Sequence, residues 1–300
     1  MKSKFVLLII LTLFFKLAGF SQKVYFAISG GYGWGYGALN SYESTGLSPG
    51  VSSGLYTMGN NTSSNNVTNI NNVTNSLQNK SFSFSNGIQF DLLGGYLINS
   101  HIAFELGFGY ISSTTVQFTT KYSVIDSASN YSSSSMNTTS LKGGIYVLTS
   151  GVKFILGNGK FRPYSFLGLT IGISPKVYQD ISGIDGMGNN YHETDAYFGN
   201  TPFGITSKIG VSYFISKNLS FFSELNCLSM VWIPSNLDVT AYDVNNQSQL
   251  SSLPTSYLKY QFLNNSSYSS NQSSLLASQF APISLSFNSI GAKIGVIYLF

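Results

Sequence analysis

The segment Ile102-Ala103-Phe104-Glu105-Leu106-Gly107-Phe108-Gly109-Tyr110 alternates between two kinds of residue along its whole length. Large apolar residues stand at every even position, and small or polar residues stand at every odd one. Successive side chains of a β-strand point to opposite faces, so this pattern is typical of a strand with one apolar and one polar face. We therefore expect a β-strand here.

The same alternation recurs in seven other segments, although Phe222 and Leu228 interrupt the polar face of one of them. Proline cannot donate to a strand ladder, and no proline stands at the centre of an expected strand. The eight expected strands cover residues 24–36, 82–96, 102–110, 140–156, 163–174, 203–215, 221–228 and 289–300.

The composition narrows the class of protein. Charged residues make up 9% of the chain, against roughly 25% in soluble globular proteins. Aromatic residues reach 15%, yet no apolar run is long enough for a membrane helix. A charged soluble enzyme, a helical membrane protein and a charge-rich disordered chain are all disfavoured. A secreted β-sandwich would also alternate, but its outer faces need charge. The polar faces here are mostly Gly, Ser and Thr, which suit a narrow barrel interior.

The connections alternate between long and short. Residues 37–80, 121–139, 175–201 and 233–282 form long connections, whereas 99–101, 157–160 and 216–218 are tight turns. This order is typical of outer-membrane barrels, and closure satisfies the strand edges that a bilayer would leave unpaired. The sequence thus predicts an all-β fold: a closed eight-stranded antiparallel up-and-down transmembrane β-barrel with four long outer loops and three short periplasmic turns.

The N-terminus predicts export. Lys2 and Lys4 precede an apolar core at 5–15, which is typical of a signal peptide and too short for a membrane helix. We expect residues 1–21 to be the signal peptide and 22–300 to be the barrel domain. Without the signal, 12 basic residues face 11 acidic ones, so no basic surface for nucleic acid remains. The expected location is the outer membrane of a Gram-negative cell envelope, crossed by many strands.

The chain ends in Tyr298-Leu299-Phe300, preceded by apolar residues at alternate positions. With the strand order, this ending resembles the small eight-stranded outer-membrane β-barrel family, which contains outer membrane proteins A, W and X. The resemblance covers residues 23–300. It implies that the barrel-assembly machinery reads Ile294, Val296, Tyr298 and Phe300 as an assembly signal. It implies little about individual function, because many activities share the scaffold.

The polar faces of the expected strands would place three acids and three bases inside the barrel: Asp91, Glu105, Glu224, Lys153, Lys208 and Lys293. Charges in a narrow lumen lose hydration, so a balanced set predicts ion pairs that plug the interior.

Counting from the turns predicts the partners within this set. Glu105 and Lys153 stand at similar depth on neighbouring strands, so we expect them to pair. Glu224 stands between Lys208 and Lys293 on the neighbouring strands, so we expect these three residues to form a second cluster. Asp91 has no obvious partner in the sequence, and Arg162 is a loose candidate for it.

The long loops carry few groups suited to catalysis. The third loop holds Asp180, Asp185, Glu193 and Asp195, but without the spacing of a calcium loop, so we expect a solvated acidic segment and no metal. The two histidines are His101 and His192, and we expect no Ser-His-Asp arrangement at a common depth. The expectation is therefore no enzyme, no catalytic residue and no cofactor.

The predicted function is an integral outer-membrane scaffold that presents Asn- and Ser-rich outer loops to the surroundings or to a protein partner. Outer-membrane lipid and, during biogenesis, the barrel-assembly machinery are its other expected partners. Two alternatives stay open: a narrow channel for small apolar solutes, and a subunit of a larger secretion or uptake complex.

Overall fold

The computed structural model describes residues 23–36, 83–126, 131–185, 188–262, 278–280 and 283–300. The predicted signal peptide and the first long loop lie outside these residues. Eight of the described strands form the barrel: β1 (Val24–Gly35), β2 (Gly87–Leu97), β3 (Ile102–Ser113), β5 (Tyr131–Ile155), β6 (Phe161–Ile184), β8 (Phe203–Phe214), β9 (Leu219–Trp232) and β15 (Ser289–Leu299).

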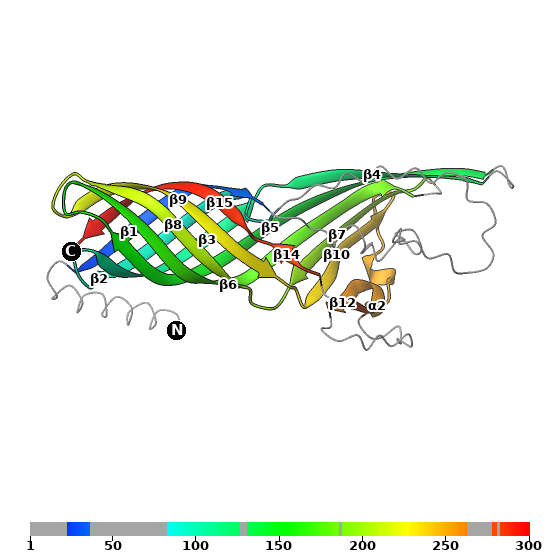
Figure 1. The fold of residues 1–300 in the computed structure, drawn as a ribbon. Helices are drawn as coiled ribbons and strands as arrows, with labels where there is room; N and C mark the ends of the chain where they lie inside the picture. The colour runs from blue at the N-terminus through cyan, green and yellow to red at the C-terminus, as the bar shows by residue number, and fades with distance from the viewer. Residues whose placement is uncertain (1–22, 37–82, 127–130, 186–187, 263–277, 281–282) are drawn as a thin grey trace.

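The barrel closes on itself through antiparallel pairs. The strand order runs β6-β8-β9-β15-β1-β2-β3-β5, and β5 pairs back with β6. The last strand lies beside the first, with Phe26 opposite Tyr298. Every barrel strand therefore has two neighbours, which leaves no open edge among them (Figure 1). The predicted eight-stranded fold is confirmed.

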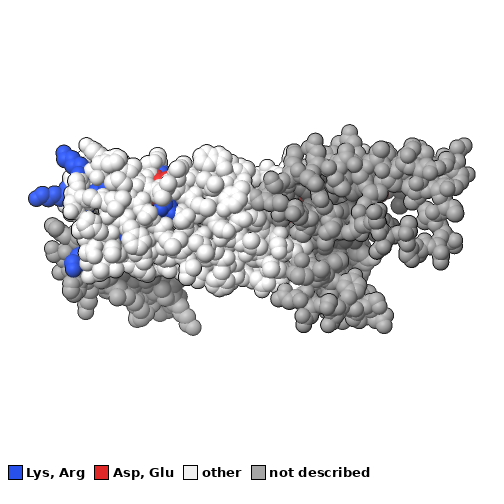
Figure 2. All heavy atoms as spheres, viewed as in Figure 1, with Lys and Arg blue, Asp and Glu red and all other residues white. Residues whose placement is uncertain are grey.

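The outer surface of the barrel is apolar, because the large apolar side chains of the alternating segments point outward. Phe104, Phe108 and Ile205 are 46%, 45% and 54% exposed, whereas the residues on either side of Phe104 and Phe108 are buried. Figure 2 shows that the visible middle of the barrel is almost free of charged atoms, while Lys and Arg gather at the end with the short turns. Such a surface is stable against acyl chains and unstable in water, so this barrel spans a bilayer.

No helix among the described residues is both long and apolar enough to cross a membrane.

Beyond the barrel, the sheet continues as an extension that projects from the end opposite the short turns (Figure 1). The outer parts of β5 and β6 belong to it. Its other elements are β4 (Val116–Asp126), β7 (Asn190–Phe198), β10 (Asn236–Val244), β11 (Gln247–Ser248), η1 (Leu250–Ser252), α2 (Thr255–Leu258), β12 (Lys259–Phe262), β13 (Ser278–Phe280) and β14 (Leu285–Ser286).

This extension corrects the predicted loops. Most of 121–139 and 175–201, and part of 233–282, are strands. Above the bilayer a strand's outward face needs no apolar residues, so the alternation that marks the barrel strands fades. On β7 the inward face still carries Tyr191 and Tyr197, and both are buried. Because the outward face of these segments is polar, their sequence pattern predicted loops rather than strands.

The boundary between barrel and extension lies at a β-bulge in β6. The pairing with β5 shifts between Gly144 and Tyr146, where β6 carries the extra residue. Ser174 there has a positive φ of 48°, and Pro175 follows it with no N–H for the ladder. A bulge bends a strand and increases its twist. The expectation that this strand ends at residue 174 is wrong, because β6 continues through the bulge to Ile184.

Candidate functional site

The lumen is the best candidate site, and its inner half holds three buried ion pairs. Lys153 Nζ lies 3.0 Å from Glu105 Oε1. Lys208 Nζ lies 3.3 Å from Glu224 Oε1. The side chain of every one of these four residues is at most 7% exposed. The third pair joins Lys293 Nζ to Asp91 Oδ2 at 2.5 Å. The lumen of the described barrel is therefore electrically balanced.

The third pair differs from the expected partners. Lys293 lies directly opposite Glu224 in the β15–β9 register, but its ammonium group contacts Asp91 on β2 instead. Arg162 is not the partner of Asp91. Its Nε donates to the Gly159 carbonyl in a tight turn. Its guanidinium carbon lies 4.1 Å from the centre of the Phe214 ring.

Glycines explain how lumen side chains reach past their neighbours. Tyr25 on β1 donates to Glu105 on β3 across Gly95, which both residues oppose in register. A Cβ at Gly95 would lie 2.1 Å from the Tyr25 ring. Tyr164 likewise donates to Glu224 across Gly210. At these two positions the missing side chain of glycine therefore leaves room for a hydrogen bond between residues on strands that are not direct neighbours.

A small polar chamber of about 30 Å³ adjoins the ion pairs, and Asp91, Lys208 and Lys293 line part of it. Its walls include a hydroxyl row in which Thr149 and Thr206 each lie within hydrogen-bond distance of Thr170. Asn226, which also lines the chamber, donates to Gln89, and its side-chain oxygen is buried without a hydrogen-bond partner among the described residues. A chamber of this volume and polarity has room for about two water molecules.

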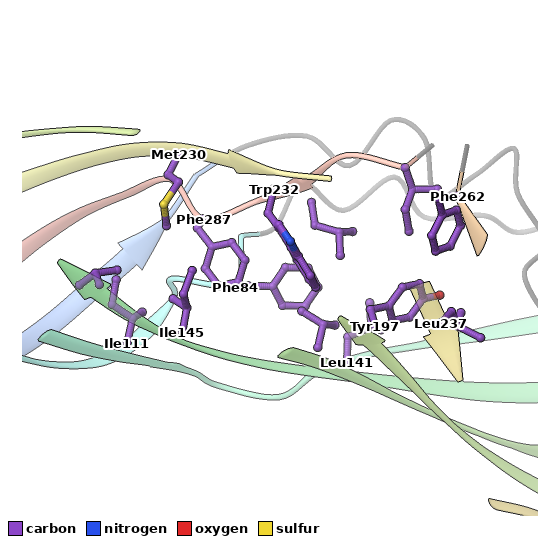
Figure 3. Close-up of a cluster of buried hydrophobic side chains, with 14 of the residues drawn as sticks. Phe84, Ile111, Leu141, Ile145, Tyr197, Met230, Trp232, Leu237, Phe262 and Phe287 are labelled. Atoms are coloured by element: carbon purple, nitrogen blue, oxygen red, sulfur yellow. The ribbon is translucent and has the colours of Figure 1, made fainter. Parts of the chain in front are cut away.

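An apolar plug closes the outer mouth of the barrel, where barrel and extension meet. Trp232 and Phe287 are fully buried, and Phe84 is 2% exposed. The Phe287 ring packs 5.8 Å from Phe84 and 6.3 Å from Trp232, centre to centre. The Trp232 indole N–H donates to the Gly199 carbonyl at 2.7 Å. Figure 3 shows these three rings packed together near Leu141 and Ile145.

Two carboxyl groups are buried under the extension. Glu193 and Asp195 point inward from β7 and are 1% and 0% exposed, and no other described residue donates a hydrogen bond to their four oxygens. Burial raises the pKa of Glu193 to about 7. Burial, and then the neighbouring Glu193 charge, raise the pKa of Asp195 to about 9. The expectation of a solvated acidic loop is therefore wrong for these two residues, although Asp180 is exposed.

His192 lies on the opposite face of β7 from Glu193 and Asp195, and it points outward. There it lies between Ser182 on β6 and Asp243 on β10. The expectation that no Ser-His-Asp arrangement forms at a common depth is wrong, since the three strands bring these residues into one row.

Among the residues that the structure describes, no three His, Cys, Asp or Glu side chains come together in a way that would hold a metal ion.

The final strand carries the residues of the expected assembly signal. Ile294, Tyr298 and Phe300 point outward and are 71%, 48% and 46% exposed. Val296 is half-buried between Ile28 on β1 and Phe221 on β9. All four therefore belong to the apolar belt of the barrel.

No family model and no curated protein matches the sequence. Among solved structures, the chain is similar to the outer membrane protein OprG from Pseudomonas aeruginosa, with 12% identity and a TM-score of 0.37 over 93% of this chain and 97% of that one. This similarity concerns the fold alone. The class of this protein follows from the molecule itself, which has a closed barrel, an apolar belt and a balanced, buried lumen. The chain is an integral outer-membrane β-barrel protein that crosses the membrane with eight strands.

Proposed function

We propose that this protein is a non-conducting outer-membrane anchor that presents its β-sheet extension to a protein partner outside the cell. The observation that carries the proposal is the double closure of the lumen. Three buried ion pairs fill the inner half, and the apolar plug around Trp232 fills the outer mouth. An eight-stranded barrel has an interior only wide enough for side chains. The ion pairs and the apolar plug therefore each support a barrel that does not conduct.

The extension supports the second half of the proposal. β5 and β6 run without interruption from the membrane into the extension and pair with each other along both parts. β7 and β10 continue that sheet beyond β6. A partner held on such a sheet would keep a defined orientation relative to the membrane. This role requires no catalysis by the lumen groups.

Two further partners belong to the proposal. Outer-membrane lipid covers the apolar belt, and the barrel-assembly machinery engages Ile294, Val296, Tyr298 and Phe300 during insertion. The outward orientation of these side chains on β15 supports that role, because an assembly factor can contact them before the barrel closes against lipid.

Planar bilayer recordings test the closed lumen. We expect the wild-type protein to show no steady unitary conductance. A variant with Trp232→Ala, Phe287→Ala, Asp91→Ala and Lys293→Ala should conduct, because it lacks the plug and one ion pair; this variant proves that the assay detects an open barrel. Phe108→Ala, which removes a lipid-facing ring, is the matched control and should remain silent. Steady conductance of the wild-type protein would overturn the proposal.

A narrow channel for small apolar solutes is the second candidate. Besides the polar chamber, a pocket of about 40 Å³ lies near the short turns, with walls that include Tyr25, Leu97, Ile155 and Phe214. Transport would require the plug to move. Swelling of proteoliposomes with small solutes, absent from empty liposomes, would favour the channel over the anchor.

A role as a subunit of a larger secretion or uptake complex is compatible with the anchor. Co-purification in mild detergent tests it, with Phe108→Ala and Phe203→Ala separating contacts of the barrel wall at two positions. A stoichiometric partner that leaves only when the wall is changed would support the complex and contradict presentation by the extension.

A further inference from the structure

Ser182, His192 and Asp243 form a row across three strands of the extension. Ser182 on β6 lies directly opposite His192 on β7, and Asp243 on β10 lies directly opposite the same histidine. Directly opposed residues in an antiparallel sheet have Cβ atoms about 4.5–5.5 Å apart. The histidine therefore has a hydroxyl on one side and a carboxylate on the other.

A β-bulge in β10 places Asp243 on this face. The register with β7 shifts between Val239 and Ala241. Before the bulge, odd-numbered Leu237 and Val239 are buried, so an unbroken strand would turn Asp243 inward as well. The extra residue, Thr240, donates from its hydroxyl to the Thr194 carbonyl at 3.0 Å. Bulges commonly re-aim a side chain beside a functional site.

The histidine and the aspartate already interact. His192 Nδ1 lies 3.8 Å from Asp243 Oδ2, with the two side chains 48% and 37% exposed. This leaves Nε2 as the nitrogen available to a base-catalysed step at Ser182. In free enzymes such contacts are often long and tighten when substrate binds.

The row borders a groove of about 420 Å³, which lies in the range of small-molecule sites. Ile184 adds an apolar wall, while Asn190 and Asn246 add side-chain amides. The groove thus combines a nucleophile, a base, a carboxylate and N–H donors that could stabilise an oxyanion. Because it lies on the extension beyond the barrel, its substrate would arrive from the medium rather than from the bilayer.

We propose that this row hydrolyses carboxylic esters of soluble compounds. His192 Nε2 takes the Ser182 hydroxyl proton as Oγ bonds to the ester carbonyl carbon. The tetrahedral adduct collapses, the bond to the alcohol oxygen breaks, and His192 returns the proton to the departing alcohol. Water then attacks the acyl-serine with the same base, which releases the acid and restores Ser182. Asp243 orients the ring and stabilises its protonated form.

The chemistry favours an ester over an amide. An alcohol leaves a tetrahedral adduct with less help from a proton donor than an amine does. The contact between the His192 ring and its carboxylate is 3.8 Å long, so the proton donor is loosely held and suits the easier leaving group.

The test uses the full-length protein in detergent, with a fluorophosphonate probe and p-nitrophenyl butyrate as the ester. We expect the probe to form a covalent bond with Ser182, located by peptide mass spectrometry, and Ser182→Ala to abolish both labelling and hydrolysis. His192→Gln should lower the hydrolysis rate about 100-fold, and Asp243→Asn about 10-fold or more.

Ser140→Ala is the matched control: it removes a serine of β5 that lies outside the row, and should hydrolyse at the wild-type rate. A heat-dependent gel shift shared by all variants shows that each barrel is folded. A wild-type protein that is neither labelled nor active, or a Ser182→Ala variant that keeps wild-type hydrolysis, would overturn the inference. Neither result changes the expected bilayer conductance, so the proposed anchor function is tested independently of the esterase activity.

Discussion

Lys293 contacts Asp91 across β1, although Glu224 lies directly opposite it on β9. Gly31 on β1 lies opposite Lys293, whereas Asp91 lies opposite Ser29, two residues along the same face of β1. A Cβ at Gly31 would lie 2.8 Å from the Lys293 side chain, so the glycine leaves room for this side chain on its way to Asp91. Glu224 is meanwhile held by Tyr164 and Lys208. The partner of Lys293 thus depends on the room that a glycine leaves, as well as on depth along the strands.

The room that glycine leaves can be tested at Gly95. Gly95→Ala should displace the Tyr25 ring from Glu105, because the new Cβ would overlap the ring. A buried hydroxyl and carboxylate that lose a hydrogen bond reduce the free energy of unfolding by about 1–3 kcal/mol. Urea unfolding in lipid vesicles measures the change. Gly94→Ala is the control, since the nearest atom to its Cβ is 4.0 Å away; an equal loss at both positions would contradict the explanation.

The ion pair between Asp91 and Lys293 should behave as a coupled unit. Asp91→Asn and Lys293→Met should each lower the free energy of unfolding by about 3–5 kcal/mol, because each leaves an unpaired charge in the lumen. The double variant should lose less than the sum. The comparison cycle pairs Lys293→Met with Glu224→Gln, and its coupling energy should be smaller. A larger coupling energy between Lys293 and Glu224 than between Lys293 and Asp91 would show that Glu224, as expected from the sequence, is the main partner of Lys293.

The membrane-facing surface can be tested at Phe108. Phe108→Arg should reduce the free energy of folding into vesicles by about 2–4 kcal/mol if this side chain lies near the middle of the bilayer. Phe108→Leu, which keeps an apolar side chain, should cause a much smaller loss. Equal stability of Phe108→Arg and Phe108→Leu would show that this face meets water.

The buried carboxyl pair should make the extension weaker in alkali. The pKa values of Glu193 and Asp195 are raised to about 7 and about 9, above those of an unfolded chain near 4. Between these limits the folded state binds more protons, so the stability of the extension is fully present below about pH 4 and is lost as pH rises towards 9. Hydrogen exchange of β7 and β10 at pH 5 and pH 9 measures this.

A Glu193→Gln and Asp195→Asn variant is the control for the carboxyl pair. It carries no titrating group at either position, and its exchange should depend on pH only through the chemistry of the amide itself. Protection that falls equally in the variant and the wild-type protein would assign the effect to other groups.

The sequence predicted the barrel well because the bilayer imposes a strict pattern on it. An outward residue such as Phe104 must be apolar and its neighbour Glu105 must face the lumen, so period-two alternation appears wherever a strand crosses. Phe222 and Leu228 broke the pattern for a physical reason: both point inward and pack in apolar clusters of the lumen. Alternation alone cannot tell a polar lumen from one with apolar layers.

The extension and the row at His192 could not be predicted in the same way. Ser182, His192 and Asp243 meet only after β6, β7 and β10 pair and after the bulge at Thr240 changes the phase of β10. Register and bulges depend on pairing between distant segments, which no local pattern encodes. The partner of Lys293 was missed for a similar reason, since it depends on the space above Gly31.

The length of β5 has a mechanical consequence. The strand is 25 residues long, and its pairing with β3 covers only residues 144–154. The thirteen residues from Tyr131 to Gly143 therefore stand clear of the barrel wall, a contour of roughly 40 Å at the usual rise per residue. A ligand bound near the far end of this segment would be held away from the bilayer surface, and any pull on it would be passed along the backbone of β5 into the membrane.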